Sequence, residues 1–146
     1  MTDPLYREML LDHYKHQKNR GRLTDPDGTA HDANPMCGDV VDVDVKIKDG
    51  KIVEIGFDGH GCAICMASAS LLSEKIKGGK VEDVMAINQD DVLGLLGIET
   101  LGPARIKCAM LPAKTMKLAC IDHLTKSHEE NSTTQMDEGL DNQDTS

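Results

Sequence analysis

The stretch VDVDVKIKDGKIVEIGF, residues 41–57, decides the fold. Its first half alternates Val or Ile with Asp or Lys, which predicts a strand with one apolar and one polar face. Asp49-Gly50 is a two-residue turn signal of the kind that joins antiparallel strands. The residues from Ile52 to Phe57 predict a second strand. We therefore expect a β-hairpin at the centre of the domain.

Helical patterns flank this hairpin on both sides. Asp3-Pro4 supplies a cap and a first-turn proline, so a helix is expected over about 3–16, followed by a loop over 24–34. From Cys62 a run of small residues predicts a helix that packs closely, most simply on the sheet. Further helices are expected at about 81–87, 90–96 and 109–126, the last with Pro112 in its first turn. This order predicts an α+β domain with a small antiparallel sheet packed against several helices.

Length, composition and charge limit the class of protein. The chain has 146 residues, which fits one domain, and one Phe, two Tyr and no Trp leave packing to aliphatic side chains. Six acidic and no basic residues lie between Ser127 and Ser146, so they carry −6 of the net charge of −9 and leave −3 for residues 1–126. We expect a folded domain over 1–126 and an acidic disordered tail over 127–146. A nucleic-acid partner is not expected, because that requires a basic face.

The cysteine count indicates metal or thiol chemistry. There are five Cys, with no signal peptide and no apolar run of transmembrane length, so we expect a cytoplasmic protein without a membrane partner. Thiols stay reduced in that compartment. The cysteines are therefore predicted to be metal-binding or catalytic rather than paired in disulfides.

Three of the cysteines lie at predicted boundaries between loops and regular elements. Cys37 precedes the first long strand, Cys62 lies where the second strand ends and a helix begins, and Cys108 lies just before the last helix. Thiolates on the rigid ends of elements make a preorganised site, and a helix N-terminus favours a thiolate. The alternative is that all three are small buried residues of the core.

Asp39 and Lys107 are the charged neighbours of these cysteines. In an extended segment Asp39 would point to the same side as Cys37, which suits a site of three sulfurs and one oxygen for zinc or iron–sulfur chemistry. The alternative is a turn residue that accepts backbone hydrogen bonds. Lys107 and Arg105 would favour a Cys108 thiolate and an incoming sulfur compound, unless they are only a solvated basic pair.

The other thiols and His60 give weaker signals. Cys65 follows Cys62 by one helical turn, so it either reaches the site or is a buried small residue, and the Cys-x-x-Cys pattern alone is not specific. Cys120 lies among apolar residues of the last helix and is expected in the core. His60 precedes Cys62 by two positions, and a surface or structural role is expected for it.

Three ordered boxes together resemble the U-type iron–sulfur cluster assembly family, which contains IscU, SufU and the N-terminal part of NifU. The boxes are Asn34-Pro35-Met36-Cys37-Gly38-Asp39, Gly59-His60-Gly61-Cys62-Ala63-Ile64 and Arg105-Ile106-Lys107-Cys108-Ala109-Met110-Leu111. The opening helix is similar as well, so the resemblance covers about residues 3–124.

The resemblance implies a site and partners. It implies an IscU/SufU-like sandwich in which Cys37, Asp39, Cys62 and Cys108 bind zinc or build a transient iron–sulfur cluster. Cys108 would receive sulfur from a cysteine desulfurase and pass it to a downstream scaffold or acceptor protein. Lys107 before the third Cys is similar to SufU. The spacing of 46 positions between Cys62 and Cys108 lacks the insertion usual in SufU.

The resulting hypothesis is an iron–sulfur cluster assembly protein that accepts persulfide sulfur with Cys108 as the acceptor. The chain would be either a cluster scaffold or an enzyme, a zinc-dependent sulfurtransferase. One alternative is a structural zinc-binding adaptor module that transfers no sulfur. Another is a dithiol redox protein that uses Cys62 and Cys65.

Overall fold

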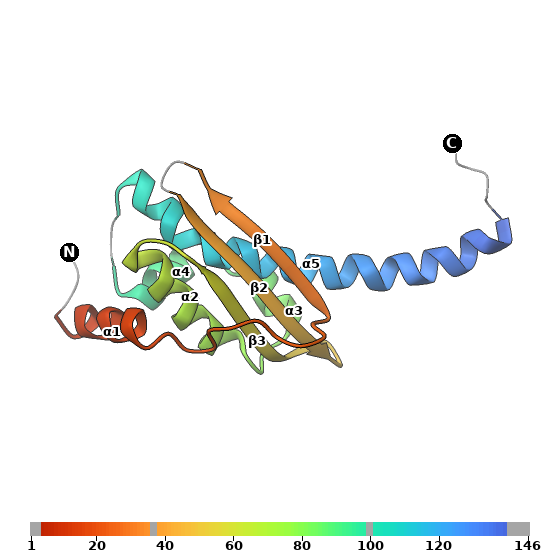
Figure 1. Ribbon diagram of the computed structural model, residues 1–146, viewed down its shortest axis with the longest axis horizontal. Coiled ribbons are helices and arrows are strands. Elements are labelled where there is room, and N and C mark those ends of the chain that lie inside the picture. The colour runs from red at the N-terminus through yellow and green to blue at the C-terminus, as the bar shows by residue number, and fades with distance from the viewer. Residues whose placement is uncertain (1–3, 36–37, 99–100, 140–146) are drawn as a thin grey trace.

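The computed structural model describes residues 4–35, 38–98 and 101–139, and within these ranges it describes side chains between Glu8 and Lys126. Its elements are α1 Pro4–Lys15, β1 Gly28–Asn34, β2 Asp39–Lys48, β3 Lys51–His60, α2 Ala63–Ile76, α3 Val81–Met85, α4 Gln89–Leu96 and α5 Pro103–Gly139. Figure 1 shows the strands in front of α5 and α2, so a sheet layer packs on a helical layer. The expected α+β class is confirmed.

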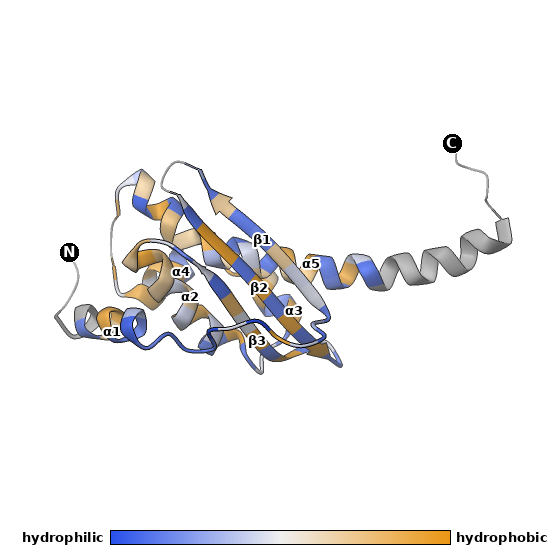
Figure 2. Ribbon diagram, in the orientation of Figure 1, coloured by the Kyte–Doolittle hydropathy of each residue, from blue (hydrophilic) through white to orange (hydrophobic). Residues whose placement is uncertain are grey.

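The predicted hairpin is the centre of the sheet. β2 and β3 pair antiparallel with Val43 opposite Phe57, and the strand order is β1-β2-β3. Asp49 and Gly50 both have positive φ, 55° and 75°, as a tight hairpin turn requires. Figure 2 shows the alternation of apolar and polar residues along β2. The apolar set faces the helices, and Val41, Val43 and Val45 are all 0% exposed.

The sequence prediction missed β1. Residues 24–34 were expected to be loop, yet Gly28–Asn34 forms an edge strand antiparallel to β2. Its sequence, GTAHDAN, has little intrinsic strand propensity. Two interactions with distant segments favour it. His31 Nδ1 lies 2.6 Å from Asp42 Oδ1 across the strand pair, and Thr29 N donates to Asp122 of α5 at 3.0 Å.

The small residues of α2 bring it close to other helices rather than chiefly to the sheet. Ser68 donates to the carbonyl of Ala109 in α5 at 2.8 Å, and both residues are buried. Ser70 accepts from Lys18 N at 2.8 Å and contacts His13 Nδ1 at 2.7 Å, which fixes α1 and the segment after it. The expected close packing is therefore present, but it is chiefly against α1 and α5 rather than against the sheet, because serine hydroxyls bond to backbone groups on both sides of the helix.

The last helix begins earlier than predicted. A helix was expected at about 109–126, whereas α5 begins at Pro103 and its backbone is helical to Gly139. Proline suits the first helical position, where its missing N–H costs nothing. Cys108 therefore lies inside α5 rather than before it. Pro112 lies in the interior of the helix rather than in its first turn. The domain boundary at 126 stays a prediction.

The segment after α1 covers the polar face of the sheet. It pairs with β3 at Arg20 and then crosses to β2, where Arg22 Nε donates to Asp44 Oδ2 at 2.7 Å. Burial by itself raises the pKa of Asp44. Hydrogen bonds from Arg22, Thr29 and the Leu23 N–H outweigh that effect and hold the pKa below its ordinary value of 3.8. The carboxylate thus ties three segments together.

Candidate functional site

Asp39, Cys62 and Cys108 come together at one end of the sheet. Each offers one ligand atom, and these atoms all lie within 4.8 Å of one another. Asp39 is the first residue of β2, Cys62 directly precedes α2 and Cys108 lies in α5. The structure therefore gathers three of the four residues that the sequence singled out. The fourth, Cys37, lies outside the described residues.

A glycine makes the approach of Asp39 to Cys62 possible. Val40 pairs with His60 across β2 and β3, which places Asp39 beside Gly61. Cys62 N donates to Asp39 Oδ1 at 3.2 Å. A Cβ at Gly61 would lie 2.9 Å from Asp39 Cγ, a distance that real Cβ atoms essentially never show. Gly61 is thus a positioning residue of the site.

Cys62 is held as the N-cap of α2. Its backbone is extended, with φ −68° and ψ 168°, and its Sγ accepts from Cys65 N at 3.4 Å. The cap satisfies one of the backbone donors that a helix start leaves without an intrahelical partner. Cys62 is partly exposed, whereas the other cysteines within the described residues are buried. Of the four described thiols, Cys62 is therefore the one that solvent reaches most directly.

Cys108 is fixed by the packing of α5 on α2. The hydrogen bond from Ser68 to Ala109 O joins the two helices one residue after Cys108. Pro112 lies four residues after Cys108 in the same helix. Because proline has no N–H, the helix lacks the hydrogen bond that position 112 would otherwise donate to the Cys108 carbonyl. Cys108 is only 4% exposed. Cys108 is the sixth residue of α5. The helix dipole therefore acts on its thiol less strongly than it would on a residue in the first turn.

The donor set suits a thiophilic metal ion. Asp39 is 2% exposed, and among the described residues its Oδ2 atom has no hydrogen-bond partner. A buried carboxylate oxygen without a partner is costly unless a cation pairs with it. Tetrahedral zinc with sulfur and oxygen ligands places its ligand atoms roughly 3.5–4 Å apart. The cluster of two thiols and one carboxylate, with Cys37 two positions before Asp39, fits zinc.

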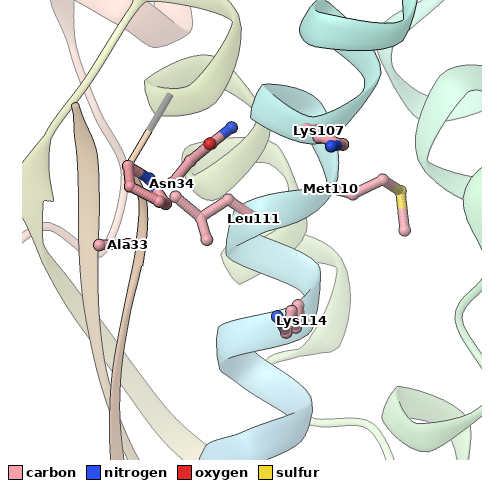
Figure 3. Close-up of a pocket in the computed structure, with 7 residues that line it drawn as sticks. Ala33, Asn34, Lys107, Met110, Leu111 and Lys114 are labelled. Carbon is pink, nitrogen blue, oxygen red and sulfur yellow. The ribbon is translucent and has the colours of Figure 1, made fainter. Parts of the chain in front are cut away.

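A cavity of about 350 Å³ lies between the end of β1 and α5, beside this cluster. Its lining is Ala33, Asn34, Pro35, Lys107, Met110, Leu111 and Lys114. Figure 3 shows Leu111 of α5 pointing toward Asn34. Lys107 directly precedes Cys108, and Lys114 pairs with Asp32 at 3.3 Å. The cavity thus offers a cationic approach next to Cys108.

The other cysteines and the histidine considered from the sequence, as far as the structure describes them, are not part of this cluster of three. His60 is exposed, and Cys65 and Cys120 are each 0% exposed in the core. Burial raises the pKa of Cys120 to about 11, which keeps that thiol protonated and unreactive. The sequence reasoning missed the role of Gly61 and the cavity wall at Asn34-Pro35. The Gly-x-Gly pattern before Cys62 was the available signal for the former.

Comparisons with known proteins found a matching family model and similar chains. The family model of the NifU-like N-terminal domain matches residues 5–130. A zinc-dependent sulfurtransferase SufU from Bacillus subtilis is 39% identical over 132 residues, covering 79% of this chain and 88% of the relative. An iron–sulfur cluster assembly scaffold protein IscU 1 from Archaeoglobus fulgidus is 32% identical over 123 residues, covering 84% and 79%.

A solved structure has the same fold. It is described as a putative iron–sulfur cluster assembly scaffold protein for the SUF system from Fervidobacterium islandicum AW-1. It matches with a TM-score of 0.66 and 32% identity, covering 77% of this chain and 94% of that one. Within the described residues, no helix combines the length and apolar character needed to span a membrane.

Proposed function

The chain belongs to the U-type iron–sulfur cluster assembly family, and from this premise we propose that it accepts persulfide sulfur from a cysteine desulfurase at the site of Cys37, Asp39, Cys62 and Cys108. The observation that carries the proposal is the gathering of one carboxylate and two thiols within 4.8 Å, from three elements far apart in sequence. We place the chain in the cytoplasm, because the chemistry requires reduced thiols.

Asp39, Cys62, Cys108 and Cys37 are the residues that would hold a zinc ion. When bound, zinc would keep the thiols as thiolates and neutralise the charge that they and Asp39 bring together. The protein's own contribution is to fix the ligands. The Gly61 contact and the Cys62 N–H orient Asp39, and the cap of α2 orients Cys62.

Cys108 is the proposed acceptor. Its thiolate attacks the outer sulfur of the donor persulfide, the donor's S–S bond breaks, and the donor cysteine leaves as a thiolate. A new persulfide is then carried by Cys108, with no net oxidation. Lys107 lines the cavity that begins one residue from Cys108, and its charge favours the approach of an anionic persulfide. Asp39 is proposed to be the labile ligand of the site during sulfur acceptance.

Digestion with trypsin shows which cysteine accepts the sulfur, because it places Cys108 on a different peptide from the other cysteines. Cys108 lies in peptide 108–114, Cys37 in 23–46, Cys120 in 118–126, and Cys62 with Cys65 in 52–75. After anaerobic incubation with a desulfurase and L-cysteine, followed by alkylation, mass spectrometry should place the extra sulfur on peptide 108–114, and Cys108→Ser should abolish it. Sulfur on 52–75 instead would move the assignment to the exposed Cys62. Sulfur on no peptide would favour the adaptor alternative.

A second measurement distinguishes a zinc-dependent sulfurtransferase from a cluster scaffold. Desulfurase turnover is followed in the presence of the zinc-loaded protein, together with the zinc that the protein retains. Strong stimulation with zinc retained over many turnovers identifies a sulfurtransferase that passes sulfur to a downstream acceptor. Weak stimulation, with zinc displaced and a cluster chromophore after iron is added, identifies a scaffold.

A further inference from the structure

We propose that Cys62 and Cys65 form a redox-modification site, a dithiol that closes to a reversible disulfide under peroxide and so takes Cys62 out of the metal and sulfur site. Cys65 is not one of the gathered ligand residues, and the proposed sulfur chemistry does not use it. The pairing rests on the geometry of α2 alone. Only its consequence for sulfur acceptance rests on the proposed function.

The start of α2 places Cys62 and Cys65 one helical turn apart. Cys62 is the N-cap and Cys65 is the third helical residue, and Cys65 N donates to Cys62 Sγ at 3.4 Å. The side chains of these two positions are neighbours in capped helices, as the capping box illustrates. Helix geometry sets the Cα atoms of positions i and i+3 about 5 Å apart. That separation lies within the usual range for disulfides of about 4.4–6.8 Å.

The two thiols differ in a way that assigns their roles. Cys62 is partly exposed, so peroxide reaches it, while Cys65 is 0% exposed and sits in the core beside it. The Cys62 thiolate attacks one peroxide oxygen, the O–O bond breaks, and hydroxide leaves, which gives a sulfenic acid on Cys62. The Cys65 thiol then attacks that sulfur and water leaves. Two thiols are oxidised by two electrons, and one peroxide is reduced to two waters.

Cys108 is the competing partner, because its ligand atom also lies within 4.8 Å of that of Cys62. A bond to Cys108 would draw together α5 and the start of α2, which the Ser68–Ala109 hydrogen bond already holds in position. A bond to Cys65 requires only rotation of side chains on one helix. The local pair is therefore favoured.

The experiment treats the full-length protein, as purified, with equimolar hydrogen peroxide. It is then alkylated and digested with trypsin without reductant. Peptide 52–75 carries both thiols and no other cysteine, so the expected result is that most of it becomes lighter by two hydrogens and resists alkylation until dithiothreitol is added. Recovery of 52–75 linked to 108–114 or to 23–46, or carrying sulfinic acid without the intrapeptide bond, would overturn the proposal.

Two variants sharpen the test. In Cys65→Ala, peptide 52–75 should gain oxygen instead of losing hydrogens. Cys120→Ala removes a different buried thiol and should form the disulfide at the wild-type yield. With excess peroxide, sulfur acceptance should be lost in both variants, and dithiothreitol should restore it only in Cys120→Ala, because without Cys65 the Cys62 thiol is oxidised on to a sulfinic acid that dithiothreitol does not reduce. If neither variant accepts sulfur before oxidation, the proposed function fails, whereas the peptide map still decides the disulfide.

Discussion

At the scale of single residues, Asp39 links metal binding to stability. Its buried Oδ2 has no hydrogen-bond partner among the described residues, while Oδ1 accepts from Cys62 N. Within the part of the chain that the structure describes, the metal-free protein therefore leaves one buried carboxylate oxygen of Asp39 without a hydrogen-bond partner, which is destabilising. A bound cation removes that cost, so the loaded and metal-free forms should differ clearly in stability.

Asp39→Asn tests this link, because the amide keeps an oxygen for the Cys62 N–H and removes the charge. Zinc at about 100 times its dissociation constant should stabilise the wild type by about 2.7 kcal/mol, and a chelator should reverse that gain. The variant should show a much smaller chelator effect, and its metal-free form should be at least as stable as the metal-free wild type. Thermal unfolding with and without chelator measures both. A metal-free variant clearly less stable than the wild type would contradict this account.

Gly61 should matter for metal binding through Asp39. In Gly61→Ala the new Cβ would meet Asp39 Cγ at 2.9 Å and displace the carboxylate. Displacing a group that orients a ligand typically weakens metal affinity about 10–100-fold. Competition with a chromophoric zinc chelator measures the change. Gly94→Ala is the matched control, because no atom lies within 4 Å of its new Cβ. The control should bind zinc normally and gain up to about 1 kcal/mol of stability.

Lys107 should affect the rate of sulfur acceptance rather than metal affinity. Its side chain lines the cavity beside Cys108 and is exposed. Lys107→Glu should lower the rate of sulfur acceptance and make that rate less dependent on salt concentration, since a cation that attracts an anionic donor is lost. Lys48→Glu makes the same charge change at the far end of β2 and is the control. Rapid-quench persulfide labelling gives the rates. Equal rates in the two variants would remove Lys107 from the approach path.

The residues of this site could be predicted from the sequence better than their surroundings. Asp39, Cys62 and Cys108 each stand beside a recognisable boundary signal, and the structure does bring them together. The role of Gly61 could not be derived, because it depends on the register that places it beside Asp39. The burial of Cys108 also depends on where α5 begins, and a Gly-Pro pair is compatible with either a break or a helix start.

At the scale of elements, Asp44 anchors the segment after α1 to the sheet. Its side chain is 2% exposed and accepts from Arg22 Nε at 2.7 Å and from Thr29 at 2.7 Å. The pKa of Asp44 is lower in the folded protein than its ordinary value of 3.8. A lowered folded pKa means that the stabilisation is complete above the unfolded value and is lost as the pH falls through the folded one.

Asp44→Asn should therefore be destabilising at pH 7, by about 1–3 kcal/mol, because charge-assisted hydrogen bonds are lost. As the pH falls below 3.8, the wild type should lose stability faster than the variant, so that their difference narrows. Urea unfolding at a series of pH values measures this. Asp42→Asn, on the same strand with the exposed partner His31, should cost less at pH 7. A difference that widens in acid would contradict the assignment.

The elements also show why sequence prediction failed in places. The β2–β3 hairpin carries its alternation and its turn in consecutive residues, so it could be predicted from local pattern alone. β1 has no such pattern, because a strand containing Gly, Asp and Asn depends on pairing with β2 and on contact with α5. The region of Gly28 illustrates this, since a Cβ there would lie 2.2 Å from the Ala119 carbonyl oxygen.

At the scale of the whole molecule, the charge pattern of the sequence changes near Lys126. The residues from Ser127 onward carry six acidic side chains and no Lys or Arg, and Met136 and Leu140 are their only large apolar residues. The family match ends at residue 130. Before this point α5 makes the contacts that close the core, including the hydrogen bond from Thr29 N to Asp122.

A chain that ends at Lys126 should therefore keep the melting temperature, zinc affinity and sulfur acceptance of the full chain, because the sequence of the removed residues has too little apolar content to add to a core. A chain that ends at Lys117 is the contrasting variant. It lacks Ala119 and Cys120, both 0% exposed, and the Asp122 partner of β1, so it should unfold or melt far lower. Calorimetry and persulfide labelling compare the three chains. A fall in melting temperature on removing 127–146 would extend the domain into the helical residues beyond Lys126, and a selective loss of sulfur acceptance would assign that segment to contact with the donor.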